Sequence, residues 1–243
     1  MSDITAPATV DAAAPGPAPL RRSFLLDPAV LLLPVAVLLA AILLPLEPSK
    51  AFGLPAHPLL VHVPVVLVPL LAVAVVVLAV RPSWRLRYGL AAVVSAVVTM
   101  VGTILAAGAG EALRAQRSSR TGGPAGVPQQ QGTGAAAARP GGNGGEGRQL
   151  AQHADLGAML RLLVILFALA LIVLVIVDRY GIHTGGRGGV LTSRPVGIAL
   201  TVVVVVLAVL SLIWVIRTGH VGAQMTWGRE GGGAPTGGRR PPG

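Results

Sequence analysis

The stretch HPLLVHVPVVLVPLLAVAVVVLAV, residues 57–80, carries the clearest membrane-spanning signal in the chain. Two histidines lead into an apolar run long enough to cross a bilayer, since about 20 apolar helical residues suffice. Backbone groups in lipid must bond to one another, so such a run is predicted to be an α-helix. Apolar runs of this kind lie at roughly 29–46, 59–80, 89–109, 158–178 and 196–217. We therefore predict an all-α, polytopic transmembrane helix bundle with five spans: a four-helix core plus an N-terminal helix.

The composition is typical of a membrane protein and excludes several kinds of cross-link and cofactor site. Charged residues make up 12% of the 243 residues, about half of the share usual in soluble proteins. The chain has no cysteine, which excludes disulfides, iron–sulfur clusters, thiolate zinc sites and covalent c-type haem. The net charge of +10 is almost all arginine in loops and tails, where it marks topology and can contact anionic lipid head groups. We favour topology marking over nucleic-acid binding, so no nucleic-acid partner is predicted.

Low-complexity segments divide the chain into domains. Glycine, proline and glutamine dominate the segment between the third and fourth spans and predict a flexible loop. The predicted parts are a disordered N-terminal tail (1–27), an N-terminal transmembrane helix (28–47), a four-helix membrane domain (53–228) with a flexible loop at 115–150, and a disordered C-terminal tail (229–243). The start RRSFLLDP also resembles a signal sequence, but its apolar run is long for one and four spans follow. We prefer an uncleaved helix.

Basic residues near helix ends predict the orientation. With five spans, the two termini lie on opposite sides of the membrane. Short segments on the N-terminal side are rich in arginine: Arg81, Arg85, Arg87, Arg179, Arg187 and Arg194. Because short basic loops stay inside, we predict a multi-pass cell-membrane protein whose N-terminus is cytoplasmic and whose long loop and C-terminus are outside.

Four of the five histidines fall on the predicted outer side. His57 precedes the second span, His62 lies in its first turns, His153 precedes the fourth span and His220 follows the fifth. Neutral imidazole is a good ligand for iron, copper or zinc. The pattern predicts a shared site near the outer boundary; the alternative is that each histidine lies separately at the interface. His183, on the other side, is interpreted as ordinary surface.

Arg161 extends this candidate site. His153, Gly157 and Arg161 are four residues apart and share one helix face. The guanidinium could hold an anionic group such as a propionate or a lipid phosphate. Snorkelling of the arginine to lipid head groups is the alternative.

Two further patterns concern helix shape and packing. Pro64 removes the helical donor for the Leu60 carbonyl, and Pro69 does the same for Val65, so the second span is predicted to bend beside His62. The third span carries small residues at helical spacing, which let helices approach closely in lipid. They are Ala91, Ser95, Thr99, Gly102, Ala106 and Gly110. The third span is therefore predicted to be the packing centre.

The sequence does not contain the residue patterns that several common activities require. We find no paired carboxylates within the spans, no Ser–His–Asp pattern, no phosphate-binding loop and no dinucleotide-binding glycine set. The centres of the predicted spans also contain no ionisable residue, which argues against a proton pump or an ion-coupled transporter.

At HPLLVHVPVVLVP, HADLG and GHVGAQMTWG the sequence resembles a bacterial membrane family, the domain of unknown function 2231 family. That family's pattern has a His-Pro-x-x-Val-His-x-Pro start, a later histidine before a helix and a closing Gly-His-x-Gly. The matching residues are His57, Pro58, Val61, His62, Pro64, His153, Gly219, His220 and Gly222. The resemblance covers about residues 53–228 and departs at Ala223, where a second glycine is common. It implies a four-helix membrane core with a histidine cluster; some relatives are suspected of binding haem, and no activity is agreed.

These observations lead to one functional hypothesis and two alternatives. The leading hypothesis is binding of haem b or a metal ion at the outer face by His62, His153 and His220, with His57 as a fourth candidate, for electron transfer or redox sensing. A redox or membrane-protein partner would accompany it. The alternatives are a structural or accessory membrane subunit without a cofactor, and metal handling without redox chemistry.

Overall fold

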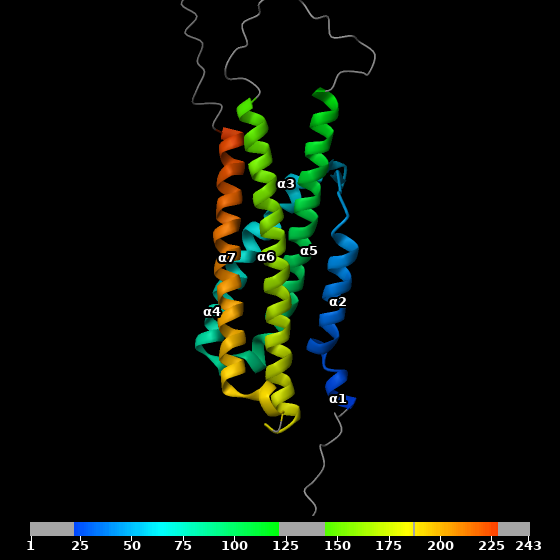
Figure 1. Ribbon diagram of the computed structural model, residues 1–243. Helices are drawn as coiled ribbons and strands as arrows, with labels where there is room; N and C mark the ends of the chain where they lie inside the picture. The colour runs from blue at the N-terminus through cyan, green and yellow to red at the C-terminus, as the bar shows by residue number, and fades with distance from the viewer. Residues whose placement is uncertain (1–21, 122–143, 187, 228–243) are drawn as a thin grey trace, which may run out of the picture.

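The computed structural model describes residues 22–121, 144–186 and 188–227. Long helices run side by side along one axis and form an elongated bundle (Figure 1). The four long helices are α4 (His62–Val80), α5 (Pro82–Thr121), α6 (Gly144–His183) and α7 (Arg194–Trp227). Each lies in a helical segment long and apolar enough to cross a membrane. The chain is thus a polytopic helical membrane protein with four such segments.

The four long helices close into a ring. Helix α4 contacts α5 and α7, and α6 contacts the same two helices from the other side. The interior of the ring is apolar and closely packed: Val68, Met100, Phe167 and Val204, one from each helix, are all 0% exposed. Large apolar side chains also cover the outside of the bundle, as expected when lipid is the solvent.

The N-terminal segment contains two helices, α1 (Arg22–Leu25) and α2 (Pro28–Leu43). Helix α2 has 16 residues, and at about 1.5 Å per residue it is about 24 Å long, shorter than a hydrocarbon core of about 30 Å. The fifth span predicted at 28–47 is therefore present only as a short apolar helix. It ends early because Pro45 cannot continue the hydrogen-bond ladder.

Helix α2 packs against α5 and α6. Its contact face is made of small residues: Ala29 and Ala36 are 0% exposed and Ala40 is 7% exposed. These positions are seven and four residues apart, so they lie on one helix face. Alanines let the backbones approach, which suits packing in a lipid environment.

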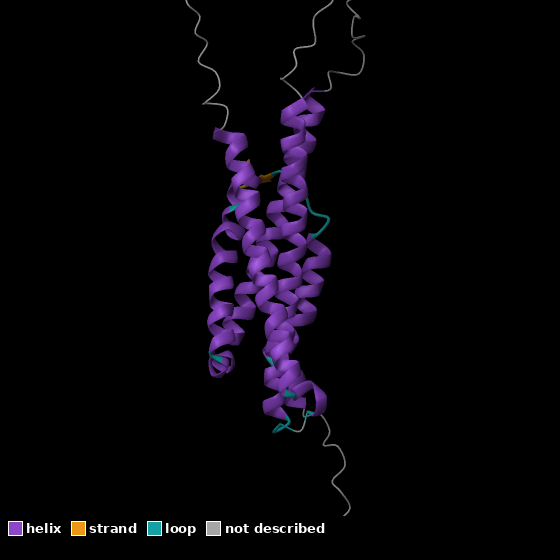
Figure 2. Ribbon diagram, turned by 60° about the vertical axis from the view of Figure 1, so that its left-hand side comes forward, coloured by secondary structure: helices purple, strands orange, loops and turns teal. Residues whose placement is uncertain are grey.

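A short non-helical link joins α2 to the ring. Strands β1 (Lys50–Ala51) and β2 (Leu54–Pro55) pair antiparallel (Figure 2). Phe52 and Gly53 turn between them with φ of 53° and 80°. Helix α3 (Ala56–Leu60) follows and is separated from α4 at Val61. This interruption confirms the break predicted beside His62, because Pro64 offers no N–H to the Leu60 carbonyl.

The small-residue stripe of α5 packs over only part of its length. At Gly102, a Cβ atom would overlap the side chain of Val63, so glycine is needed for the close approach of α4. Ala91 and Ser95, nearer the start of α5, are exposed instead. Helix α5 nevertheless contacts α2, α3, α4 and α6, and 56% of its apolar window is buried. This buried share is larger than in the other three spanning segments, but α6 likewise contacts α2, α5 and α7, so the prediction that the third span is the packing centre holds only in part.

The loop and the N-terminal tail are shorter in the structure than predicted from the sequence. Residues 115–121 continue α5 and residues 144–150 begin α6, which corrects both edges of the loop predicted at 115–150. Alanine, glutamine and arginine favour a helix in residues 115–121. Residues 144–150 contain three glycines, so they are helical as the extension of an anchored helix and not by propensity. Residues 22–27, predicted as tail, form α1, a turn and the N-cap of α2. The remaining tail residues, the loop centre at 122–143 and Arg187 lie outside the described residues.

The α6–α7 connection completes the fold. After α6 ends at His183, the short helix η1 (Gly189–Thr192) contacts both α6 and α7. It lies at the same end of the bundle as α1 (Figure 1).

Candidate functional site

The bundle has two polar ends, and each collects side chains from several helices. We call the end that carries α3, the start of α6 and the end of α7 the histidine end; it holds His57, His62, His153 and His220. We call the opposite end, with α1 and the α4–α5 and α6–α7 connections, the arginine end; it holds Arg81, Arg85, Arg87 and Arg179. The prediction that four histidines share one end agrees with this arrangement of helices (Figure 1).

His57 and His153 are in contact across the bundle. Their ring centroids are 6.3 Å apart and the ring planes are nearly perpendicular, at 85°. His57 comes from α3 and its Nδ1 donates a hydrogen bond to the Ala106 carbonyl of α5, over 3.0 Å. A carbonyl can only accept, so the proton lies on Nδ1 and the lone pair of Nε2 remains available. The Nδ1 atom of His153 is buried and has no hydrogen-bond partner among the described residues.

Two glycines make room for this histidine pair. A Cβ atom on Gly110 of α5 would lie 3.1 Å from Cε1 of His57, and one on Gly222 of α7 would lie 3.2 Å from Cε1 of His153. Larger side chains at either position would push against a ring. The pair is thus surrounded by backbone from α5 and α7, which fixes the position of both imidazoles.

His62 and His220 do not join the pair. His62 is exposed, and its Nδ1 donates to the Pro58 carbonyl within the same segment, over 2.7 Å. His220 is also exposed, and its Nε2 accepts from the Gln224 amide one turn later on α7, over 3.0 Å. Both rings are therefore engaged locally, as interfacial histidines would be. The described part of the chain contains no group of three or more histidine, aspartate or glutamate side chains placed to hold a metal ion.

Arg161 has a protein partner. Its Nη1 atom lies 3.5 Å from Oε1 of Glu111 on α5, and both side chains are partly exposed. From the sequence, Arg161 was predicted either to hold an anionic group or to snorkel to lipid head groups, and Glu111 was not considered. The signal was present, since Glu111 follows Gly110 on the extension of the small-residue helix, but pairing it with α6 requires knowing how α5 and α6 align.

At the arginine end, Arg85 joins three helices. Its Nε lies 3.5 Å from Oδ2 of Asp178 on α6, and its Nη1 donates to Oγ1 of Thr201 on α7, over 2.9 Å. The Arg85 and Asp178 side chains are only 13% and 23% exposed. Arg85 was predicted only as a topology marker, because the third apolar run begins after it, at residue 89. In lipid, a buried ion pair of this kind ties helices together.

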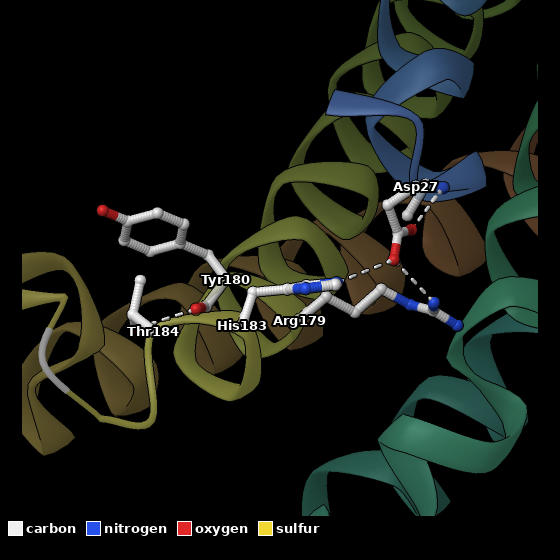
Figure 3. Close-up of polar contacts among 6 residues, drawn as sticks. Asp27, Arg179, Tyr180, His183 and Thr184 are labelled. Carbon is white, nitrogen blue, oxygen red and sulfur yellow. Dashed lines mark hydrogen bonds and ion pairs between the residues drawn. The ribbon is translucent and has the colours of Figure 1, made fainter. Parts of the chain in front are cut away.

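Asp27 anchors the N-terminal segment at the same end (Figure 3). Its Oδ1 accepts from the Ala29 N–H and caps α2, while its Oδ2 accepts from Arg179 Nη1 over 2.9 Å. His183 Nε2 lies 3.7 Å from the same oxygen, and its ring packs on Phe24. The prediction that His183 is ordinary surface is therefore wrong, because His183 is part of this contact. The dipeptide Asp27–Pro28 was the available signal, since Asp favours the N-cap and Pro the first helical position.

The environment of Asp27 favours its charged form. Burial of the carboxyl raises its pKa, but hydrogen bonds from Ala29 and Arg179, with the positive charge of Arg179, outweigh burial. The pKa of Asp27 therefore lies below its ordinary value of 3.8. The carboxylate is ionised at neutral pH and can hold α2 against the end of α6.

The comparisons with known proteins agree with this architecture. Residues 53–235 match the family described as "Predicted membrane protein (DUF2231)". The chain belongs to this family. The matched region begins just before α3 and includes all four long helices and all four residues of the histidine end, whereas α2 precedes it. The resemblance noted in the sequence is thus confirmed for this DUF2231 protein. No curated protein and no solved structure matches the chain.

Proposed function

We propose that the protein binds haem b at its histidine end, where His57 and His153 would hold it, and serves in electron transfer or redox sensing. The observation that carries the proposal is the contact between these two imidazoles from α3 and α6. His62 and His220, which the sequence placed in a joint metal site with His153, are engaged within their own segments. The proposal therefore reduces the ligand set to two.

The number of ligands favours haem over a bare metal ion. A structural or catalytic zinc ion takes three or four protein ligands. Haem brings its own equatorial nitrogens and needs only one or two axial side chains from the protein. Among the described residues, His57 and His153 have no third ligating group beside them. Two histidines alone match what haem requires.

The two imidazoles would hold the haem iron between them. Their ring centroids are 6.3 Å apart, so both rings are close enough to serve the same group. The bond from His57 to the Ala106 carbonyl is also the kind of second contact that orients a ligating histidine. Bound haem would supply reversible one-electron chemistry of iron.

The membrane arrangement is part of the proposal. We place the arginine end in the cytoplasm by the positive-inside rule, so that the histidine end faces outward. Helix α2 would lie in the bilayer as a fifth, shorter membrane helix against α5 and α6. A redox protein docking at the outer face would then reach the histidine end.

An optical titration tests the proposed cofactor. The purified full-length protein in detergent is titrated with hemin and its Soret band is followed. We expect saturable binding at one haem per chain. This affinity should fall in His57→Ala and His153→Ala, each of which keeps one of the two ligands. The variants His62→Ala and His220→Ala are matched controls at the same end and should retain it. Helical content from circular dichroism identifies any variant that fails to fold.

Other outcomes favour the alternatives. A protein that stays colourless but carries stoichiometric copper or zinc would indicate metal handling. A protein that binds neither haem nor metal, with an unchanged helical content in His153→Ala, would indicate a structural or accessory membrane subunit. The observation that favours this second function is the set of ion pairs that already tie α2, α5 and α6 together without any cofactor.

A further inference from the structure

A groove runs between α4 and α5 on the outside of the bundle. It encloses about 480 Å³ and starts near the arginine end, where Trp84 and Tyr88 form one wall. Leu70 and Val77 of α4 line the other wall. Ser95 lines the groove farther along α5 from the arginine end. The groove exists because the small residues of the α5 stripe in this half face no neighbouring helix.

The dimensions of the groove suit a lipid chain. Its α5 wall extends from Trp84 to Thr99, which at about 1.5 Å per residue corresponds to about 22 Å along the helix. One leaflet contributes about half of a hydrocarbon core of about 30 Å. An acyl chain that enters at the arginine end can therefore lie in the groove over its full depth in that leaflet.

The mouth of the groove is aromatic and positively charged. The Arg81 guanidinium lies 5.7 Å from the centre of the Trp84 ring, and the Arg87 guanidinium lies 5.4 Å from the centre of the Tyr88 ring. The two rings contact each other with centroids 5.7 Å apart. Neither Arg81 nor Arg87 takes part in an ion pair among the described residues, whereas Arg85, between them in sequence, is held by Asp178.

We propose that this groove binds an anionic phospholipid, with an acyl chain between α4 and α5 and the phosphate at Arg81 and Arg87. The apolar groove recognises the chain, and two unneutralised guanidinium groups recognise the charge of the head group. A second copy of the protein fits less well. Copies inserted in the same direction would bring the same arginines together across a symmetric interface, where like charges repel.

Native mass spectrometry of the full chain released from vesicles tests the site. The vesicles contain equal amounts of phosphatidylglycerol and phosphatidylcholine. We expect the protein to retain one phosphatidylglycerol molecule preferentially. The variants Arg81→Gln and Arg87→Gln should each weaken that retention about fivefold, because each removes the attraction of one basic residue to the anionic head group. Ser95→Leu, which fills the groove without removing charge, should abolish it.

Arg217→Gln is the matched control. Arg217 also stacks on a tryptophan, Trp214, but on α7 at the other end, so its loss should leave lipid retention unchanged. Equal retention of both lipids by the wild type would overturn the proposal. So would unchanged retention in the Arg81→Gln, Arg87→Gln double variant. A dimer mass that becomes monomeric in Ser95→Leu would assign the groove to a second copy instead.

Discussion

The arginine end and the histidine end of the bundle use polar side chains in different ways. At the arginine end, Arg85 and Arg179 each face an aspartate from another segment, and both pairs hold helices together. At the histidine end, two imidazoles from different segments meet with no carboxylate between them, and one buried nitrogen has no partner among the described residues. Both ends keep buried side-chain atoms without a hydrogen-bond partner among the described residues: Arg85 Nε, Asp178 Oδ2 and Arg179 Nε at the arginine end, and His153 Nδ1 at the histidine end. The difference lies in charge. Opposite charges that face each other indicate a structural role, whereas two imidazoles without a countercharge can act as metal ligands.

The largest expected effect of substitution is at the arginine end. Asp178→Asn would leave Arg85 without its countercharge in a mostly buried position. We expect a loss of about 3 kcal/mol in the free energy of unfolding, the lower part of the range for breaking a buried ion pair, because both side chains keep some exposure. Equilibrium unfolding in mixed detergent measures it. A loss below about 1 kcal/mol, the value of an exposed pair, would contradict the structural role of this contact.

At the histidine end, a bulky residue at Gly222 should affect cofactor retention more than folding. Gly222→Val would displace the His153 ring, which a Cβ atom alone already approaches within 3.2 Å. Overpacking costs roughly 1–3 kcal/mol, so we expect haem affinity to fall about tenfold or more. Gly219→Val on the same helix is the matched control, since its Cβ atom would meet nothing within 4 Å. Equal affinity in the two variants would contradict the assigned position of His153.

Asp27 predicts a pH-dependent attachment of α2. Its pKa is lowered in the folded protein, so the stabilisation is fully present above the ordinary value of 3.8 and is lost as the pH falls through the lower folded value. Asp27→Ala removes the cap and the Arg179 contact at any pH and should cost about 1–2 kcal/mol of α2 docking. Hydrogen exchange of the α2 amides measures this. Equal protection in wild type and variant at neutral pH would be inconsistent with the anchor.

The smallest effect is expected at the ion pair of the histidine end, where the acidic partner is more exposed than at the arginine end. Glu111→Gln removes the partner of Arg161 where both side chains are partly exposed, so the stability should change by about 0–1 kcal/mol. Unfolding measured beside Asp178→Asn gives a direct comparison of the two ends. If Glu111→Gln were as destabilising as Asp178→Asn, the distinction between a buried and an exposed pair would fail.

The apolar runs made the fold largely predictable. Four spans, the large buried share of α5 and the break at Val61 follow from apolar length, small-residue spacing and proline chemistry, which are local properties of the sequence. Helix ends were harder to predict. Arg85 was assigned to a loop because hydropathy falls at charged residues, although α5 begins before it and carries it into the bundle.

The candidate site was predicted only in part, because contacts between segments depend on how the helices align. Sequence placed all four histidines at one end but gave no reason to prefer His57 over His220 as the partner of His153. That choice depends on α3 packing on α5 at Ala106 and Gly110. The attachment of Asp27 to Arg179, 152 positions away, is likewise set by the tertiary packing of α2.

Electron paramagnetic resonance of the ferric, haem-loaded protein tests the central claim most directly. Two axial imidazoles give a low-spin iron centre. We expect a low-spin signal in the wild type, conversion to high spin in both His57→Ala and His153→Ala, and recovery of the low-spin signal when free imidazole is added. A low-spin signal that persists in both variants, or a haem-loaded wild type that is high spin, would contradict ligation by this pair.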